Sequence, residues 1–129
     1  LDVDHFKRIN DTHGHLVGDD CLRAVADVLR RHVREGDDFV ARYGGEEFVV
    51  LLPGATRDDA ARRAEILRSE VAALRIADHG ETISLTISLG LSAMDGNDLH
   101  SGPDKLIRAA DAALYRAKRE GRNRLVVAD

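Results

Sequence analysis

The sequence predicts a single α+β domain of the ferredoxin-like type over residues 1–129, with helices covering a central, mostly antiparallel sheet. The first observation is the order of β-prone and helix-periodic segments, which is β-α-β-β-α-β followed by α-β. The second is that no repeat or linker interrupts this order. The third is composition, because 129 residues that are 43% hydrophobic can form one core without metals or disulfides.

The first half of the chain should contain three strands and one helix. Residues 1–4 alternate apolar with acidic side chains, as at the end of a strand. Residues 39–43 and 48–52 are β-prone and should form a hairpin, because Gly44-Gly45 between them tolerates the positive φ of a tight turn. Between the first strand and this hairpin, a helix over residues 17–34 is predicted by an apolar stripe of Leu22, Val25, Ala26, Leu29 and Val33.

The second half should contain two helices and two strands. Thr56 precedes a helix in which Asp59 has the position of a capping-box acid. Its buried face is expected to consist of Ala60, Ala64, Leu67, Val71 and Leu74. Residues 83–89 alternate with period two, which predicts a strand with one face in the core. After a Gly/Asn/Asp-rich loop, Pro103 should open a helix that ends before Gly121, and residues 125–128 should form the last strand. The apolar face of this last helix is expected to be Leu106, Ile107, Ala110, Leu114 and Ala117.

Charge and composition exclude several classes of protein. The net charge of -4 disfavours a nucleic-acid binder, because such affinity depends on clustered Lys and Arg. No apolar stretch approaches the ~20 residues that span a bilayer, and residues 1–4 are no signal peptide, so we expect a soluble domain without direct membrane insertion. The single cysteine, Cys21, cannot form an internal disulfide and should be a small apolar residue on a helix face.

The predicted topology brings acidic residues together at one edge of the sheet. The third strand should run antiparallel beside the first, which places Asp2 and Asp4 near Glu46 and Glu47. Carboxylates that close repel one another unless cations lie between them, and hard oxygen ligands favour magnesium, with a main-chain carbonyl near Val3 as a further ligand. The alternative is that the aspartates are solvated acids at a strand end and that the glutamates only decorate a turn.

Three separated blocks resemble the GGDEF domain family. The first runs from Leu1-Asp2-Val3-Asp4 to Asn10-Asp11 and continues with Gly14-His15 and Gly18-Asp19. The second is the signature itself, Arg42-Tyr43-Gly44-Gly45-Glu46-Glu47-Phe48. The third runs from Ala110-Asp111 through Tyr115, Lys118, Gly121, Arg122 and Asn123. The order and coverage of the blocks make the resemblance far more specific than any one of them.

The resemblance implies a palm-type nucleotidyl cyclase fold and diguanylate cyclase activity. Two GTP molecules would be condensed into cyclic di-GMP, with release of two pyrophosphates, by a two-metal mechanism with Mg²⁺ or, as the alternative, Mn²⁺. Because each domain would hold one GTP and the product is two-fold symmetric, a homodimer is expected. The family is bacterial, so a cytoplasmic domain fused to a sensory or regulatory domain is expected, and tethering to a membrane protein through other regions is compatible with this expectation.

The resemblance also implies roles for individual residues. The metal ligands would be Asp2, the Val3 carbonyl and Glu46, and Glu47 would act on the 3′-hydroxyl as ligand or base. Guanine would be bound by Asn10 and Asp19, and phosphates or other parts of the substrate by Lys7, His15, Gly44, Gly45, Lys118 and Arg122. Two simpler explanations stay open. Asp19 is an acidic residue near a helix start, where the helix dipole favours negative charge. Lys118 is a lysine in the last turn of a helix, where it complements the helix C-terminus.

Two departures from the family pattern affect these expectations. The helix and the Asp-x-Leu-Thr-Gly-Leu segment that normally precede the first strand are not present, so we expect an N-terminally truncated domain. The product-inhibition motif Arg-x-x-Asp has Asp38 in place but Glu35 at the arginine position, and Arg34 and Asp37 stand one residue earlier. A catalytically inactive GGDEF module that senses nucleotide or mediates assembly is the alternative function, and an ATP-accepting cyclase is disfavoured by Asp19.

Overall fold

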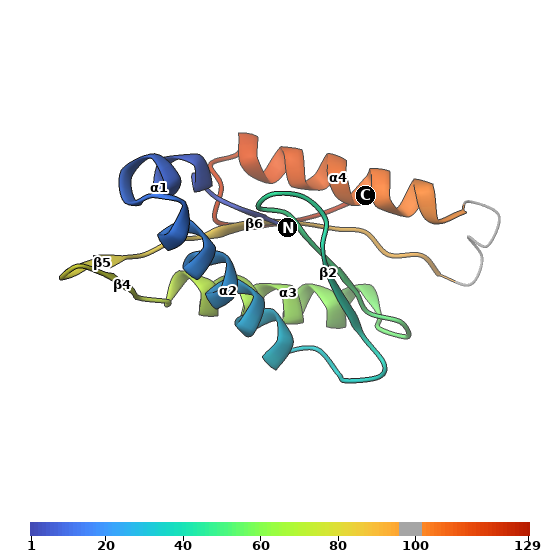
Figure 1. Ribbon diagram of the computed structural model, residues 1–129. Coiled ribbons are helices and arrows are strands. Elements are labelled where there is room, and N and C mark those ends of the chain that lie inside the picture. The colour runs from blue at the N-terminus through green and yellow to red at the C-terminus, as the bar shows by residue number, and fades with distance from the viewer. Residues whose placement is uncertain (96–101) are drawn as a thin grey trace.

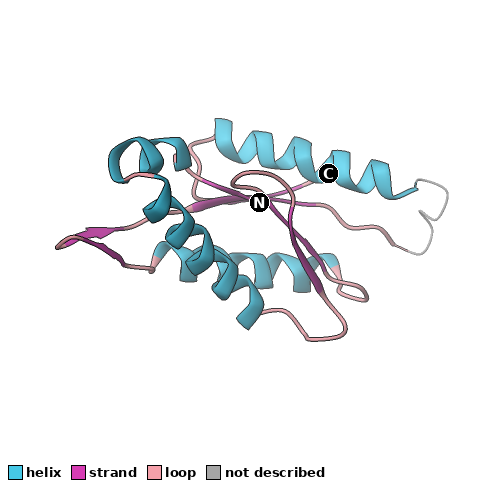
Figure 2. Ribbon diagram, in the orientation of Figure 1, coloured by secondary structure: helices cyan, strands magenta, loops and turns pink. Residues whose placement is uncertain are grey.

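The computed structural model describes residues 1–95 and 102–129 and confirms an α+β fold (Figures 1 and 2). The first half contains β1 (Asp2–Val3), α1 (Phe6–His13), α2 (His15–Arg31), β2 (Phe39–Arg42) and β3 (Phe48–Leu51). The second half contains α3 (Arg57–Ala72), β4 (Ile76–Asp78), β5 (Glu81–Ile83), β6 (Ile87–Leu91), α4 (Gly102–Arg119) and β7 (Leu125–Val127).

The strand order is that of the ferredoxin-like pattern with one strand added. β1 pairs antiparallel with β6 through Asp2 and Ser88, and an antiparallel bridge between Asp2 and Glu47 joins β1 to β3 on its other side. β2 pairs with β3, and β7 lies parallel to β6. The resulting order is β2-β3-β1-β6-β7. β1 is therefore central, and the residues that follow it lie in the middle of the molecule.

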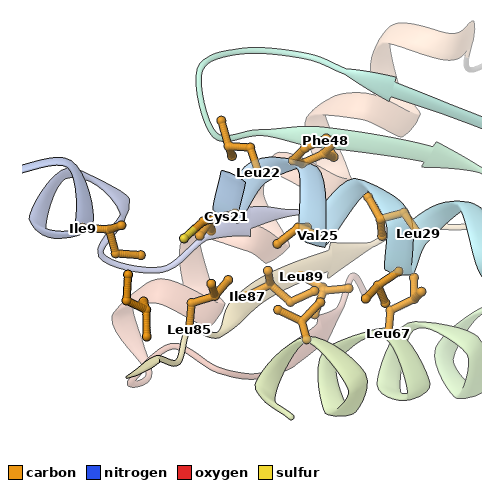
Figure 3. Close-up of a cluster of buried hydrophobic side chains, with 14 of the residues drawn as sticks. Ile9, Cys21, Leu22, Val25, Leu29, Phe48, Leu67, Leu85, Ile87 and Leu89 are labelled. Atoms are coloured by element: carbon orange, nitrogen blue, oxygen red, sulfur yellow. The ribbon is translucent and has the colours of Figure 1, made fainter. Parts of the chain in front are cut away.

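Helices cover both faces of the sheet. α2 and α3 pack on one face and α4 on the other, as Figure 1 shows. The larger core lies under α2 and α3 and includes Val25, Leu29, Val71 and Ile87, which are fully buried. Figure 3 shows Val25, Leu29 and Ile87 in this core. Cys21 belongs to this core, as expected for a small apolar residue, and its burial raises the pKa of the thiol.

α4 approaches the sheet closely at one glycine. A Cβ on Gly90 of β6 would overlap the Ala110 carbonyl oxygen and the Leu114 nitrogen and would lie 2.9 Å from the Leu114 Cα. Because these neighbours are backbone atoms of α4, they cannot move without shifting the helix. A smaller apolar cluster of Ala113, Ala117 and Val126 seals this face.

Several local predictions are confirmed. The Asp59 N–H donates to Thr56 Oγ1 at 3.1 Å, so Thr56 caps α3 as its position in the sequence suggested. α4 ends shortly before Gly121, which has a φ of 122°. β2 and β3 form the expected hairpin, and β7 covers most of the predicted last strand. The Gly/Asn/Asp-rich loop expected before α4 falls largely on residues 96–101, outside the described residues.

Other local predictions are wrong. The helix expected over residues 17–34 spans His15–Arg31, and α1 precedes it, separated by Gly14 with a φ of 88°. The strand expected over residues 83–89 is divided into β5 and β6, although its apolar residues stay buried. β5 instead pairs with β4 in a hairpin whose turn residues, His79 and Gly80, both have positive φ.

Candidate active site

The predicted acidic residues meet where Leu1, Asp2 and Val3 lie beside Glu46, Glu47 and Phe48. We refer to this end of the two strands as the β1–β3 edge. The Val3 N–H donates to the Glu46 carbonyl at 3.1 Å, and the Phe48 N–H donates to the Leu1 carbonyl at 2.9 Å. Asp2 and Glu47 face each other across the antiparallel bridge. Two residues 45 positions apart in the sequence, Asp2 and Glu47, are thereby adjacent, as the topology predicted.

Asp2 is already paired with a cation from α4. Its side chain is 7% exposed, and its Oδ2 accepts a hydrogen bond from Lys118 Nζ at 2.8 Å. Lys118 lies in the last turn of α4, so the reading as a helix C-terminal complement is compatible with its position. The contact with Asp2 also places the Lys118 ammonium group at the β1–β3 edge, next to its carboxylates.

The structure corrects the expectation for Asp4. Its carboxylate accepts hydrogen bonds from Thr86 Oγ1 at 2.7 Å, Ser88 Oγ at 2.6 Å and the Asn123 N–H at 3.0 Å. β1 ends at Val3, and the chain turns there into α1, which directs this side chain toward β6 and the segment before β7. The carboxylates of the β1–β3 edge are therefore Asp2, Glu46 and Glu47.

The Gly44-Gly45 turn differs from a tight two-residue turn. Neither glycine has a positive φ, because the connection between β2 and β3 is five residues long. Arg42 fixes it: Nε donates to the Gly44 carbonyl at 3.1 Å, and Nη2 donates to the Gly45 carbonyl at 2.7 Å. A Cβ on Gly45 would have no atom within 4 Å, so this glycine has open space beside it, whereas a Cβ on Gly44 would lie 3.8 Å from Glu47 Cβ. The sequence analysis gave Arg42 no role of its own.

The residues expected at guanine lie on α1 and α2. Asn10 Oδ1 is buried and has no hydrogen-bond partner within residues 1–95 and 102–129. Gly18 makes room for it, since a Cβ there would overlap Asn10 Oδ1. Asp19 is exposed and lines a groove between α2 and the β2–β3 hairpin, with Arg42 on the opposite side. The first turn of α2 contains no acidic residue, which removes the helix-start explanation for Asp19.

The other predicted substrate contacts are available at the surface. Lys7 on α1 and His15 at the start of α2 are exposed. Arg122 is exposed after α4 and has a φ of 63°. Lys118, by contrast, contacts the β1–β3 edge through Asp2.

In the segment of the expected product-inhibition motif, Arg34 is paired with a carboxylate of the chain itself. Asp38, not Asp37, is the partner of Arg34: its Oδ1 accepts from Arg34 Nη2 at 3.1 Å and its Oδ2 from the Arg34 backbone N–H at 2.7 Å. Arg63 of α3, which the sequence analysis missed, donates to the same carboxylate at 2.6 Å. The hydrogen bonds from Arg34, followed by those from Arg63, hold the pKa of the buried Asp38 well below its usual range.

The donors at the β1–β3 edge fit a divalent metal bound together with substrate. Over the described residues, no three His, Cys, Asp or Glu side chains converge as a metal-binding group. The expected set is two carboxylates, Asp2 and Glu46, and the Val3 carbonyl. Magnesium typically binds through one or two carboxylates and takes its other ligands from water and substrate phosphates, so an all-oxygen set of this size suits it.

The strand order, with carboxylates on β1 and directly before β3, is that of a palm-type nucleotidyl cyclase fold. The family model described as "Diguanylate cyclase, GGDEF domain" matches residues 1–124, and the chain belongs to the GGDEF family. Within the described residues, no helix combines the length and apolar character that crossing a bilayer requires.

Relatives and solved structures agree with this assignment. Diguanylate cyclase DgcP from Pseudomonas aeruginosa is 49% identical over 128 residues, which are 99% of this chain but 18% of DgcP. Response regulator PleD from Caulobacter vibrioides is 44% identical over 98% of this chain and 28% of PleD. The chain thus spans less than a third of the length of either relative.

The solved structures match over nearly the whole chain. The GGDEF domain of DgcB from Caulobacter crescentus, in complex with c-di-GMP, aligns with a TM-score of 0.89 and 37% identity over 98% of this chain and 73% of that one. The active GGEEF domain of a diguanylate cyclase from Vibrio cholerae aligns with a TM-score of 0.86 and 34% identity over 99% of this chain and 79% of that one.

Proposed function

We propose that the chain is the catalytic domain of a diguanylate cyclase, which condenses two GTP molecules into cyclic di-GMP and releases two pyrophosphates. The observation that carries the proposal is the β1–β3 edge, where Asp2 and Val3 lie beside Glu46 and Glu47. A degenerate GGDEF module has no need to keep this set together with Asp19. The relatives named as diguanylate cyclases support the same activity.

The β1–β3 edge would bind the metal ions and activate the 3′-hydroxyl of GTP. Two divalent ions, Mg²⁺ or Mn²⁺, held by Asp2, Glu46 and the Val3 carbonyl, would lower the pKa of the 3′-hydroxyl and stabilise charge on the attacking and leaving oxygens. Glu47 would accept the hydroxyl proton or orient the hydroxyl from its position opposite Asp2. Lys118 neutralises part of the negative charge of this edge through Asp2.

The two ends of GTP would be bound by different elements. Asp19 would accept from the N1 and N2 donors of guanine, which adenine lacks, and the Asn10 amide would complete base recognition from α1. Lys7, Lys118 and Arg122 would hold the phosphates by charge, without covalent chemistry. Gly44 and Gly45 would let the nucleotide approach the hairpin turn, next to which the structure has open space. His15 would contact the substrate from the exposed start of α2.

The reaction would require two copies of the domain. Each copy holds one GTP, and a symmetric product is most simply made between two facing sites related by a two-fold axis. Regulatory domains in the longer protein would control this encounter, in line with the small share of the relatives' length that the chain spans.

Mass spectrometry of the products after incubation with GTP and Mg²⁺ tests the proposal. Cyclic di-GMP and pyrophosphate in a 1:2 ratio are expected. If GTP binds but the full-length protein forms no cyclic di-GMP, the chain is the non-catalytic nucleotide-sensing module instead.

A further inference from the structure

Asp4 does not belong to the β1–β3 edge, but its hydrogen bonds connect three segments of the chain. The residue is 5% exposed, and both carboxylate oxygens are used: Oδ1 accepts from Ser88 Oγ, and Oδ2 accepts from Thr86 Oγ1 and from the Asn123 N–H. The two hydroxyls belong to β6 and the residues just before it. The third donor is a main-chain amide 119 residues away.

The segment that contains this amide has an unfavourable backbone conformation. Arg122 and Asn123 are consecutive non-glycine residues with φ values of 63° and 46°. Such left-handed residues cost free energy and persist where the surroundings determine them. The Arg122 N–H donates to the Ala117 carbonyl at 2.9 Å, which fixes the turn to the end of α4. The contact from Asp4 fixes the other side of the turn to the end of β1.

We propose that Asp4 is a positioning residue that holds the Arg122–Asn123 turn against the strand carrying Asp2 and Val3. Its carboxylate would act on GTP only indirectly, by keeping the Arg122 guanidinium at a fixed place relative to the metal ligands. The inference rests on the proposed function in one respect, since it takes Arg122 as a phosphate contact.

A direct metal contact is the competing role, and the hydrogen bonds argue against it. An aspartate that binds a cation normally keeps an oxygen free of other strong donors, whereas Oδ2 of Asp4 accepts two hydrogen bonds and Oδ1 accepts one of 2.6 Å. The main-chain donor is the informative one, because the hydroxyls of Thr86 and Ser88 can rotate but the Asn123 N–H can only donate.

The conservative variant Asp4→Asn separates the two roles. Its amide oxygen can accept from the Asn123 N–H while its NH₂ group donates to Ser88 Oγ, since a hydroxyl is also an acceptor. In the full-length protein we expect Asp4→Asn to keep kcat and the KM for GTP within about threefold, because the amide keeps the contacts with the Asn123 N–H and Ser88 Oγ although the charge of the carboxylate is lost. Loss of turnover in Asp4→Asn equal to that in Asp2→Asn would overturn the proposal and make Asp4 a metal ligand.

The variant Asp4→Ala tests whether the effect passes through Arg122. It should raise the KM for GTP by at least about tenfold with a smaller change in kcat, since the Asn123 amide loses its buried acceptor. In an Arg122→Ala background the same change should add less than about threefold, because residues that act through one another are not additive. Equal effects in both backgrounds would contradict the inference.

Two controls make these outcomes decisive. Ser88→Ala removes another partner of Asp4 but leaves the Asn123 contact, so it should change the KM by less than about threefold; a change as large as that of Asp4→Ala would indicate a packing effect only. If thermal unfolding shows that Asp4→Ala is not folded, the comparison of turnover between Asp4→Asn and Asp2→Asn alone decides between the positioning role and the metal-ligand role of Asp4. If the wild-type protein forms no cyclic di-GMP, the proposed function fails, and faster hydrogen exchange of the Asn123 amide in Asp4→Ala still tests the contact itself.

Discussion

Gly18→Ala should weaken GTP binding without unfolding the protein. Gly18 is buried in α2 and has an ordinary helical conformation. An added Cβ would overlap Asn10 Oδ1 and come within 3.0 Å of Asn10 Cγ and 3.3 Å of Phe6 Cζ. Because the overlapped atom is the end of a flexible side chain, the Asn10 amide would move out of its place and the backbone would stay.

The magnitude follows from two opposing terms. Alanine favours a helix interior over glycine by about 1 kcal/mol, so the free energy of unfolding should change by no more than about 1 kcal/mol in either direction. Loss of the hydrogen bond that we propose between Asn10 and guanine should cost about 1.4 kcal/mol or more, which is at least about tenfold in affinity. Stability and binding are therefore expected to respond differently to the same methyl group.

Calorimetric titration of a non-hydrolysable GTP analogue, paired with urea unfolding, measures both terms. Asn10→Ala is the matched comparison, since it removes the amide that Gly18→Ala displaces, and the double variant should bind no more weakly than Asn10→Ala. Unchanged affinity in Gly18→Ala, or a loss that persists in the Asn10→Ala background, would refute the role given to this pair.

Four further predictions concern specificity, packing, the pH dependence of stability and product binding. Asp19→Ser should reduce the preference for GTP over ATP by at least about tenfold in competition assays, and unchanged selectivity would place base recognition elsewhere. Gly90→Ala should lower the free energy of unfolding by about 3 kcal/mol in urea titrations, because α4 must move away from β6; a loss below about 1 kcal/mol would contradict that packing. Asp38 has a depressed pKa in the folded protein, so the stability it contributes is complete above its unfolded pKa of about 3.9 and is lost as the pH falls toward the folded value. Unfolding curves should therefore show a stability loss below pH ~4 that is smaller in Asp38→Asn, in which the other carboxylates with lowered pKa values, Glu65 and Asp78, still contribute. Because Arg34 and Arg63 are both engaged by Asp38, titration with cyclic di-GMP should show no binding at micromolar concentration, and tight binding abolished by Arg34→Ala would show a working inhibitory site.

The sequence was most informative where one physical rule decides the local structure. The hairpin of β2 and β3, the cap at Thr56 and the period-two burial of Ile83, Leu85, Ile87 and Leu89 each follow from local pattern. The strand order followed from the order of the elements, and with it the meeting of Asp2 and Glu47.

Features decided by tertiary contacts were missed. α1 has one buried apolar residue, Ile9, among polar neighbours, so its eight residues give no stripe, and packing against α2 stabilises it. Alternation over residues 83–89 could not show that the partner strand changes from β4 to β1. Neither the hydrogen bonds of Asp4 nor the pairing of Arg34 with Asp38 and Arg63 could be predicted, because the partners come from separate elements.

Measuring the formation of cyclic di-GMP by Glu46→Gln tests most directly whether the β1–β3 edge catalyses the condensation of GTP. The substitution removes a charged metal ligand but keeps side-chain size, so the circular dichroism spectrum and melting curve should match those of the wild type. With Mg²⁺ and GTP, the wild-type full-length protein should form cyclic di-GMP, and Glu46→Gln should lose at least about a thousandfold in turnover, of the order seen when a catalytic electrostatic contact is removed. Turnover by Glu46→Gln within about tenfold of the wild type would contradict the assignment of this edge as the catalytic centre.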